Sequence, residues 1–320
     1  MTAIHRRRRF MRIPVTAPWG VRIAFATAAI SGIAIWLNGY AIKQVPDAAV
    51  YTTLKNAVAA LVLILAAGAS GGAAEVRRLD RATWAKLLVV GVIGGSIPFL
   101  LFFEGLAHAT APGAAFIHKT LFVWVAVLAV PFLRERLGWA QITAMAVLLG
   151  GLVLLAPPKV GGATWSGGET MIALATLSWA VEVIVVKRLL GTVSPPLVGA
   201  ARLGLGLILL VGYLGVTGSL GSIGAVSAVG WAWVLVTGLL LAAYVATWFA
   251  ALRRAPASLV ASVLVAGAVV TPALQAISDG RLGDPTTVLG GIVVVGAAVV
   301  ACRAALGRDA VAIPRQGLPG

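Results

Sequence analysis

Two stretches, 102-FFEGLAHATAPGAA-115 and 248-WFAALRRAPASLVA-261, follow the same pattern far apart in the chain. In each, an apolar run ends in aromatic residues, and a short segment rich in alanine and containing proline leads into the next run. A second pair follows at similar spacing, 132-FLRERLG-138 and 277-ISDGRLG-283. Self-similarity of this kind indicates an internal repeat. The chain is therefore interpreted as two related halves.

The apolar runs define the fold class. A membrane-spanning helix needs about 20 apolar residues, and ten such runs are found at 23–42, 48–69, 84–107, 111–133, 138–156, 168–187, 195–216, 230–251, 256–277 and 286–305. Each half holds five of them. Because an odd number of spans reverses direction between halves, the prediction is an all-α integral membrane protein of about ten transmembrane helices, arranged as two inverted five-helix repeats.

The composition agrees with a membrane protein. The 320 residues are 60% hydrophobic and 11% charged, and the mean hydropathy is +1.00. Soluble domains usually carry about 25% charged residues, so this chain cannot cover a water-facing surface of normal size. The basic stretch 5-HRRRRFMR-12 precedes the first run, but that run is longer than the apolar region of a typical signal peptide. It is interpreted as an uncleaved first span.

The distribution of Lys and Arg sets the expected orientation. With the N-terminus inside and ten spans, the outside receives only Lys43, Lys159 and Arg281, and the inside receives nineteen basic residues. Short-loop Lys and Arg favour the cytoplasmic side, so both termini are expected in the cytoplasm and the protein in the cytoplasmic membrane. The net charge of +15 is thereby explained by topology, and nucleic acid is not an expected partner.

The expected organisation follows from these spans. It comprises a basic cytoplasmic segment, a first five-helix repeat, a linker, a second repeat and a cytoplasmic tail, at 1–22, 23–156, 157–167, 168–305 and 306–320.

Several of these segments carry a resemblance to a known family. The run 101-LFFEGLAHATAPGAA-115, the segment 132-FLRERLGWAQITAMAVLLGGLVLLAP-157 and the opening pair within 36–65 resemble the EamA family of the drug/metabolite transporter (DMT) superfamily. Lys55 stands where that family commonly has arginine, and Arg202 fits the same place in the second half. The resemblance covers roughly residues 23–305.

The resemblance implies a secondary carrier of small organic metabolites or drugs, often an exporter, with no tightly bound cofactor. Amino-acid-like solutes are the expected substrates, with proton coupling or exchange as the driving force. The chain departs from the family pattern in two places. The fourth span has His118-Lys119-Thr120 near the usual mid-helix proline, and the ninth lacks the Glu-Arg-Leu ending.

Charged side chains inside the spans are the first candidates for a site, because such residues usually face a cavity or pair with one another. Six ionisable residues lie within spans: Lys55, Glu104, His118, Lys119, Glu182 and Arg202. Lys119 is the candidate for a fixed positive charge that attracts an anionic or zwitterionic solute. His118 titrates near neutral pH in its ordinary state and would link transport to protons. Glu182 is a second candidate for that role.

Structural alternatives stand beside these roles. The pairs Glu104–Lys119 and Glu182–Arg202 would fix helix register, and Lys55 would extend its amine toward the membrane surface. Aromatic residues in the spans are candidates to line a cavity or to pack in the core: Trp36, Trp124, Trp179 and Trp248.

Other function classes lack their sequence signals. The chain has no HExxH or Walker A motif and a single cysteine, Cys302, so catalysis, metal binding by cysteines and ATP-driven transport are not expected. A channel and a non-transporting scaffold stay open. The expected partners are a small-molecule substrate and the lipid bilayer. The glycine-rich faces allow packing within one chain or between two, so a homodimer also stays open.

Overall fold

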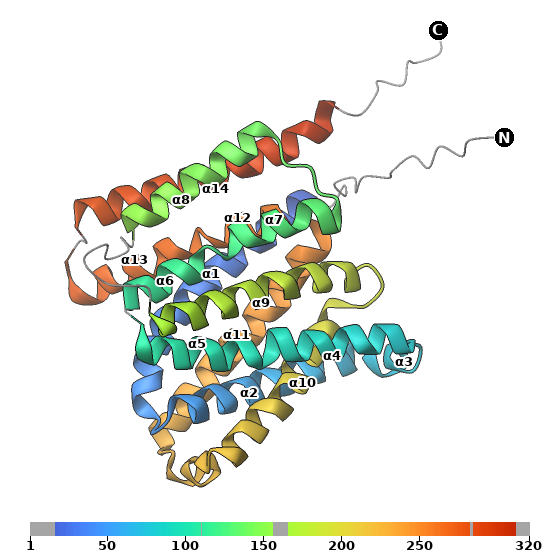
Figure 1. Ribbon diagram of the computed structural model, residues 1–320, viewed down its shortest axis with the longest axis vertical. Coiled ribbons are helices and arrows are strands. Elements are labelled where there is room, and N and C mark those ends of the chain that lie inside the picture. Colours follow the sequence, from blue (N-terminus) through green and yellow to red (C-terminus); the bar gives the residue numbers. More distant parts are fainter. Residues whose placement is uncertain (1–16, 110, 156–165, 282–283, 312–320) are drawn as a thin grey trace, which may run out of the picture.

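The computed structural model describes residues 17–109, 111–155, 166–281 and 284–311. Within these residues every regular element is a helix (Figure 1). The longer α-helices are α1 Ala17–Ala41, α2 Ala48–Ala69, α4 Arg81–Gly95, α5 Ile97–His108, α6 Ala111–Lys119, α7 Leu121–Leu133, α8 Trp139–Leu155, α9 Gly167–Leu189, α10 Pro195–Val216, α11 Ala228–Arg254, α12 Ala257–Leu264, α13 Gly267–Asp279 and α14 Pro285–Val311. The short elements are η1 Ile42–Gln44, α3 Gly72–Val76 and η2 Ser219–Ala225.

The predicted fold class is confirmed. Among the described residues, nine helical segments are long and apolar enough to cross a membrane, and the shorter apolar helix α8 accounts for the remaining predicted span. Helix α1 begins at Ala17, before the predicted start of its span at 23. The added turn is amphipathic, and the guanidinium of Arg22 lies 5.4 Å from the centre of the Trp19 ring. The segments 1–22, 157–167 and 306–320 fall mostly outside the described residues, so their boundaries stay predictions.

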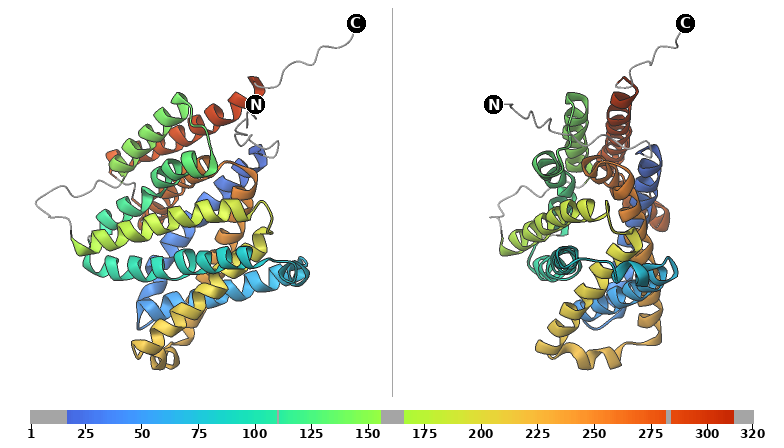
Figure 2. Two further views of the ribbon diagram at one scale, coloured as in Figure 1. Left: turned by 45° about the vertical axis from the view of Figure 1, so that its right-hand side comes forward. Right: turned by 90° about the vertical axis from the view of Figure 1, so that its right-hand side faces the viewer.

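Helices α8 and α14 form a pair at one edge of the bundle (Figures 1 and 2). They are the last helices of the two halves. Glycines allow their close approach, since a Cβ at Gly290 would lie 2.5 Å from the backbone nitrogen of Leu155, and one at Gly151 would lie 2.9 Å from Val294. Small residues permit such packing between membrane helices. The remaining spans pack with one another in the rest of the bundle.

Three of the spans are broken near their middle. The third divides into α4 and α5 at Ser96, and Pro98 lies in the first turn of α5, where a proline is tolerated. The fourth divides into α6 and α7 at Thr120, and the ninth divides into α12 and α13 at Val265 and Ala266. The fourth and ninth are counterparts in the two halves. Broken helices in the membrane are a recurring feature of transporter binding sites.

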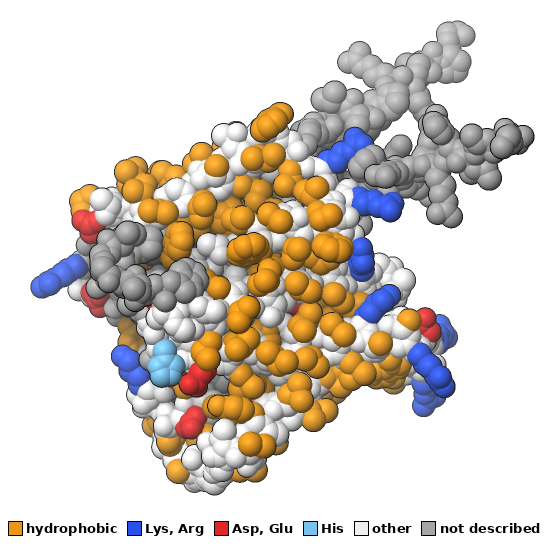
Figure 3. Space-filling model, viewed as in Figure 1, with side chains coloured by type: hydrophobic (Ala, Val, Ile, Leu, Met, Phe, Trp, Pro, Cys, Tyr) orange, Lys and Arg blue, Asp and Glu red, His pale blue; other side chains and the backbone are white. Residues whose placement is uncertain are grey.

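Charge separates the two ends of the bundle. The face in Figure 3 has a broad hydrophobic surface, and Lys and Arg side chains gather at its right-hand edge. That edge is the basic end, where α2, α7, α9, α11 and α14 finish, and it carries residues such as Arg77, Arg78, Arg134, Arg188 and Arg254. The other edge is called the opposite end. Helix α1 starts, and α14 finishes, at the basic end (Figure 1).

Acidic side chains join the two halves at the basic end. Glu135, 8% exposed, accepts hydrogen bonds from the backbone N–H of Ala257 (2.6 Å) and of Ser258 (3.1 Å), and from the Ser258 hydroxyl (2.5 Å). A carboxylate at this position satisfies the free N–H groups of α12 and interacts favourably with its dipole.

A second acid acts in the same way. Glu75 accepts from the backbone N–H of Ser194 (2.7 Å) and from its hydroxyl (2.6 Å), at the start of α10. In addition, the Nζ of Lys187 donates to the carbonyl oxygen of Ala255 at 2.8 Å and to that of Leu252. These charge-assisted bonds hold α7, α9 and the α11–α12 turn together at the basic end.

Candidate functional site

His118 and Lys119 occupy the last turn of α6, in the middle of the fourth span. A turn at Thr120 separates α6 from α7, which begins at Leu121, and the Thr120 backbone N–H and hydroxyl both donate to the carbonyl oxygen of Ile117, at 3.1 and 2.6 Å. The carbonyl end of a helix carries a partial negative charge. A cation at this place is therefore more favourable than one in the middle of a continuous span, and the break explains how Lys119 is accommodated.

The breaks of the fourth and ninth spans meet at one small cavity. It measures about 60 Å³ and is lined by Ser31, His118, Lys119, Leu121, Phe122, Tyr244, Ala261, Leu264 and Val265. These residues come from α1, α6, α7, α11 and the α12–α13 region, and so from both halves of the chain. Lys119 and His118 supply the basic groups of its lining. A cavity between repeats with a basic group at a helix break fits the binding of an anionic group.

An aromatic cluster borders this cavity through His118. The His118 ring lies 5.0 Å from the ring of Trp179 and 5.2 Å from that of Phe102, both nearly edge-on. The indole N–H of Trp179 donates to the carbonyl oxygen of Gly94 (3.2 Å), which fixes the ring. The Nδ1 atom of His118 is buried and makes no hydrogen bond with the described residues. Such an atom is costly to leave unpaired, so it is available to a ligand or a water molecule.

The Glu182–Arg202 pair lies in the interior between α9 and α10. The Arg202 Nε is 2.9 Å from Glu182 Oε1, and its Nη2 donates to Oε2 at 3.1 Å. The two residues are 1% and 6% exposed. A fork of this kind satisfies both charges at once. The sequence-based pairing of Glu182 with Arg202 is present in the structure, which leaves open whether the pair serves transport or stability.

Two glycines of α4 allow this pair to form. A Cβ at Gly94 would lie 2.4 Å from the carboxyl carbon of Glu182, and one at Gly95 would lie 1.9 Å from the backbone oxygen of Arg202. Any side chain at either position would displace α4 from its neighbours. The α4 glycines therefore place Glu182 and Arg202 in the core.

Lys55 lies in a separate polar group between α1, α2 and α11. It is 7% exposed, and its Nζ donates to Asn38 Oδ1 (3.3 Å) and lies 5.0 Å from the centre of the Tyr51 ring. The Tyr51 hydroxyl donates to Asn38 Oδ1 and lies 2.9 Å from Thr237 Oγ1. All these partners are neutral. The ion pairs Glu104–His108 and Glu182–Arg202 involve neither Lys55 nor Lys119.

The remaining candidates lie elsewhere. Glu104 is 56% exposed in its side chain and pairs with Nε2 of His108, one turn along α5, at 3.3 Å. The alternative pair of Glu104 with Lys119 is therefore not formed. Trp36 donates its indole N–H to Gln275 Oε1 (3.2 Å), which joins α1 to α13. Trp124 is 43% exposed on α7 and lies apart from the aromatic cluster around Trp179.

Some residues of the site were not anticipated from the sequence. Tyr244 lines the small cavity and stacks on Trp248, with ring centres 6.3 Å apart, but a tyrosine in an apolar run gives no signal of its own. The Glu104–His108 pair had such a signal, since residues four apart on a helix are neighbours.

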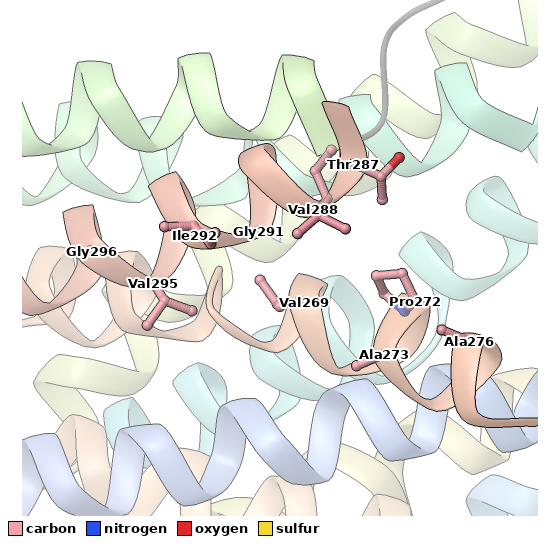
Figure 4. Close-up of a pocket in the computed structure, with 11 residues that line it drawn as sticks. Val269, Pro272, Ala273, Ala276, Thr287, Val288, Gly291, Ile292, Val295 and Gly296 are labelled. Atoms are coloured by element: carbon pink, nitrogen blue, oxygen red, sulfur yellow. The ribbon is translucent and has the colours of Figure 1, made fainter. Parts of the chain in front are cut away.

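Two further properties limit what the molecule binds. A larger cavity of about 620 Å³ lies between α13 and α14 (Figure 4). Its walls are glycine and apolar side chains apart from Thr287, so it offers no partner to a charged solute. Within the described ranges, His, Cys, Asp and Glu side chains do not gather in threes suited to a metal ion.

Comparison with known proteins agrees with the geometry. The model of the EamA-like transporter family matches residues 18–156 and again residues 166–302. A search of curated proteins gives no match. A solved crystal structure, whose title states no function, is similar with a TM-score of 0.73 and 18% identity, over 92% of this chain and 99% of that chain. At this identity the similarity supports the fold alone.

Proposed function

Because the chain belongs to the EamA-like transporter family of the DMT superfamily, we propose that this membrane transporter is a secondary exporter of small amino-acid-like metabolites or drugs. We place the basic end of the bundle in the cytoplasm, by the distribution of Lys and Arg, and the protein in the cytoplasmic membrane. The partners are then the solute and the bilayer, and a homodimer is compatible with the glycine-rich faces. The driving force is a proton gradient or exchange.

One observation carries this proposal: the breaks of the two counterpart helices meet at the cavity that Lys119 lines. Alternating access requires a site that both repeats share, and this cavity draws its walls from both. Its measured volume of about 60 Å³ is below the roughly 300 Å³ of a typical ligand pocket. Binding therefore requires the half-helices to separate, and the breaks provide places for that movement.

The charge of the site indicates the substrate class. Lys55 and Lys119 take no part in the ion pairs of Glu104 and Glu182, whereas Glu182 and Arg202 neutralise each other. The aromatic rings beside His118 offer an apolar surface. A solute with a carboxylate and a small apolar part fits these features. His118, with its unpaired Nδ1, is the group that we assign to proton coupling.

The test compares the metabolites inside cells that overproduce the protein with the metabolites in the surrounding medium. Wild type is compared with Lys119→Ala and with Lys43→Ala, which removes a lysine from the opposite end, at matched membrane abundance. We expect a carboxylate-containing solute to accumulate outside with wild type and Lys43→Ala, and to fall at least tenfold with Lys119→Ala. Equal export by all three would refute the role of Lys119.

Coupling is measured with the same solute in proteoliposomes. A pH gradient that drives uptake in wild type but not in His118→Phe would support proton coupling. Uptake that needs only unlabelled solute on the other side would indicate exchange. Flux that does not saturate and shows no counterflow would instead favour a channel.

A further inference from the structure

A third cavity lies at the opposite end of the bundle, between α2, α5 and α10. It measures about 340 Å³, within the usual range for small-molecule sites. It shares no lining residue with the cavity at the helix breaks, and Phe99 in its wall contacts Trp179 of the aromatic cluster, with ring centres 5.4 Å apart. Nothing in the proposed function uses this cavity.

The charge of this cavity is opposite to that of the chain. Asp47 and Glu104 line it, and no lysine, arginine or histidine does, although the chain carries a net charge of +15. Asp47 receives the backbone N–H groups of Ala49 (2.6 Å) and Val50 (3.2 Å), both on Oδ1. Glu104 is held by His108 outside the cavity and remains half-exposed. Two carboxylates without a lining cation attract a positively charged group.

A buried hydroxyl in the wall supplies independent support. Thr52 is 2% exposed and lines the cavity, yet its Oγ1 makes no hydrogen bond with the described residues. Burying a hydroxyl without a partner costs free energy. Its oxygen has lone pairs that accept a hydrogen bond from a donor in the cavity.

Aromatic rings complete the site. Phe99 and Phe103 line the same cavity, and the face of an aromatic ring attracts a cation, more so where water is excluded. Carboxylates, an unpaired hydroxyl oxygen and aromatic walls are together suited to an alkylammonium group with a small apolar part. We propose that this cavity is a binding site for small organic amines.

The probe is 2-phenylethylammonium chloride, titrated calorimetrically into the full chain in nanodiscs, with empty nanodiscs subtracted. Phenylacetate and 2-phenylethanol have similar shapes with a negative charge or none. We expect the ammonium to bind at least tenfold more tightly than either. Equal binding of the three, or a preference for phenylacetate, would overturn the proposal.

Variants test whether the ammonium binds in this cavity. Glu104→Gln keeps the shape of a half-exposed side chain, and we expect it to weaken ammonium binding at least fivefold. Thr52→Val removes only the hydroxyl and should weaken binding severalfold. Asp284→Asn removes an acid from the same end of the bundle, outside the cavity, and should leave binding unchanged. If Glu104→Gln binds like Asp284→Asn, the site is not this cavity.

The outcome is independent of the transport proposal. Lys119→Ala leaves the cavity between α2, α5 and α10 intact, so it should bind the ammonium as wild type does even if export is lost. Loss of ammonium binding in Lys119→Ala, with folding confirmed by thermal unfolding, would show that the amine enters the cavity at the helix breaks and would refute a second site.

Discussion

Replacing Glu182 by glutamine would leave the Arg202 guanidinium buried without its counter-charge. With the Nε–Oε1 distance of 2.9 Å and an effective dielectric constant of about 20, the attraction that is lost amounts to roughly 6 kcal/mol. Relaxation and water entry reduce the measurable effect, and truncation of one partner of a buried pair usually costs about 3–5 kcal/mol. We expect Glu182→Gln to lower the free energy of unfolding by about 3–5 kcal/mol.

The assay is unfolding by SDS in mixed micelles, with Glu104→Gln as the control that removes an exposed acid. The double variant Glu182→Leu/Arg202→Met replaces the pair by apolar groups of similar volume and should regain most of the lost stability. A loss below about 1 kcal/mol in Glu182→Gln would refute the reasoning, because the pair would then not be buried and mutually neutralised. Export by a stable double variant would show that the pair is structural, and loss of export would place it in transport.

Three other perturbations have defined outcomes. Gly95→Ala should reduce the free energy of unfolding by about 1–3 kcal/mol or more, since its Cβ would lie 1.9 Å from a backbone oxygen. The control Gly212→Ala has open space around it and should have no such effect. Equal unfolding of the two variants by SDS would contradict the close α4–α10 contact. Glu135→Gln should lose about 1–2 kcal/mol from the start of α12, visible as faster amide hydrogen exchange there, and unchanged exchange would show that the cap is dispensable. In a Cys302→Ser background, Lys43→Cys should react with an impermeant maleimide in intact cells; labelling only after permeabilisation would reverse the proposed orientation.

Much of the fold was predictable because apolar length and turn composition are local properties. Each of the ten predicted runs corresponds to a helical segment. The breaks inside spans were harder to predict. Of the prolines within spans, Pro98 lies in the first turn of α5, whereas Pro131 and Pro272 lie inside α7 and α13. The break after Lys119 lies at Thr120, whose hydroxyl donates to the carbonyl oxygen of Ile117, but Thr247 makes the same kind of bond to Tyr244 inside the unbroken α11, so the residue type alone does not predict a break.

The side-chain contacts of the candidate site were also harder to predict than the helices. Of the two pairs considered from the sequence, Glu182–Arg202 is formed, whereas Glu104 pairs with His108 and not with Lys119, because a position within a span does not say which way a side chain points. Helical spacing would have favoured His108 as the neighbour of Glu104. The contact of Tyr244 with the cavity depends on how α11 rotates against α6 and α12, and packing between helices sets that rotation.

The pairing of α8 with α14 has a consequence for biosynthesis. Helix α8 has 17 residues and ends at Leu155, and the partner that covers its glycine face begins only at Pro285. During translation α8 therefore lies in the bilayer without this partner while the intervening spans are inserted. Chains that terminate before α14 would expose this face to lipid and to membrane proteases. Assembly of the first half is completed only once α14 has been synthesised.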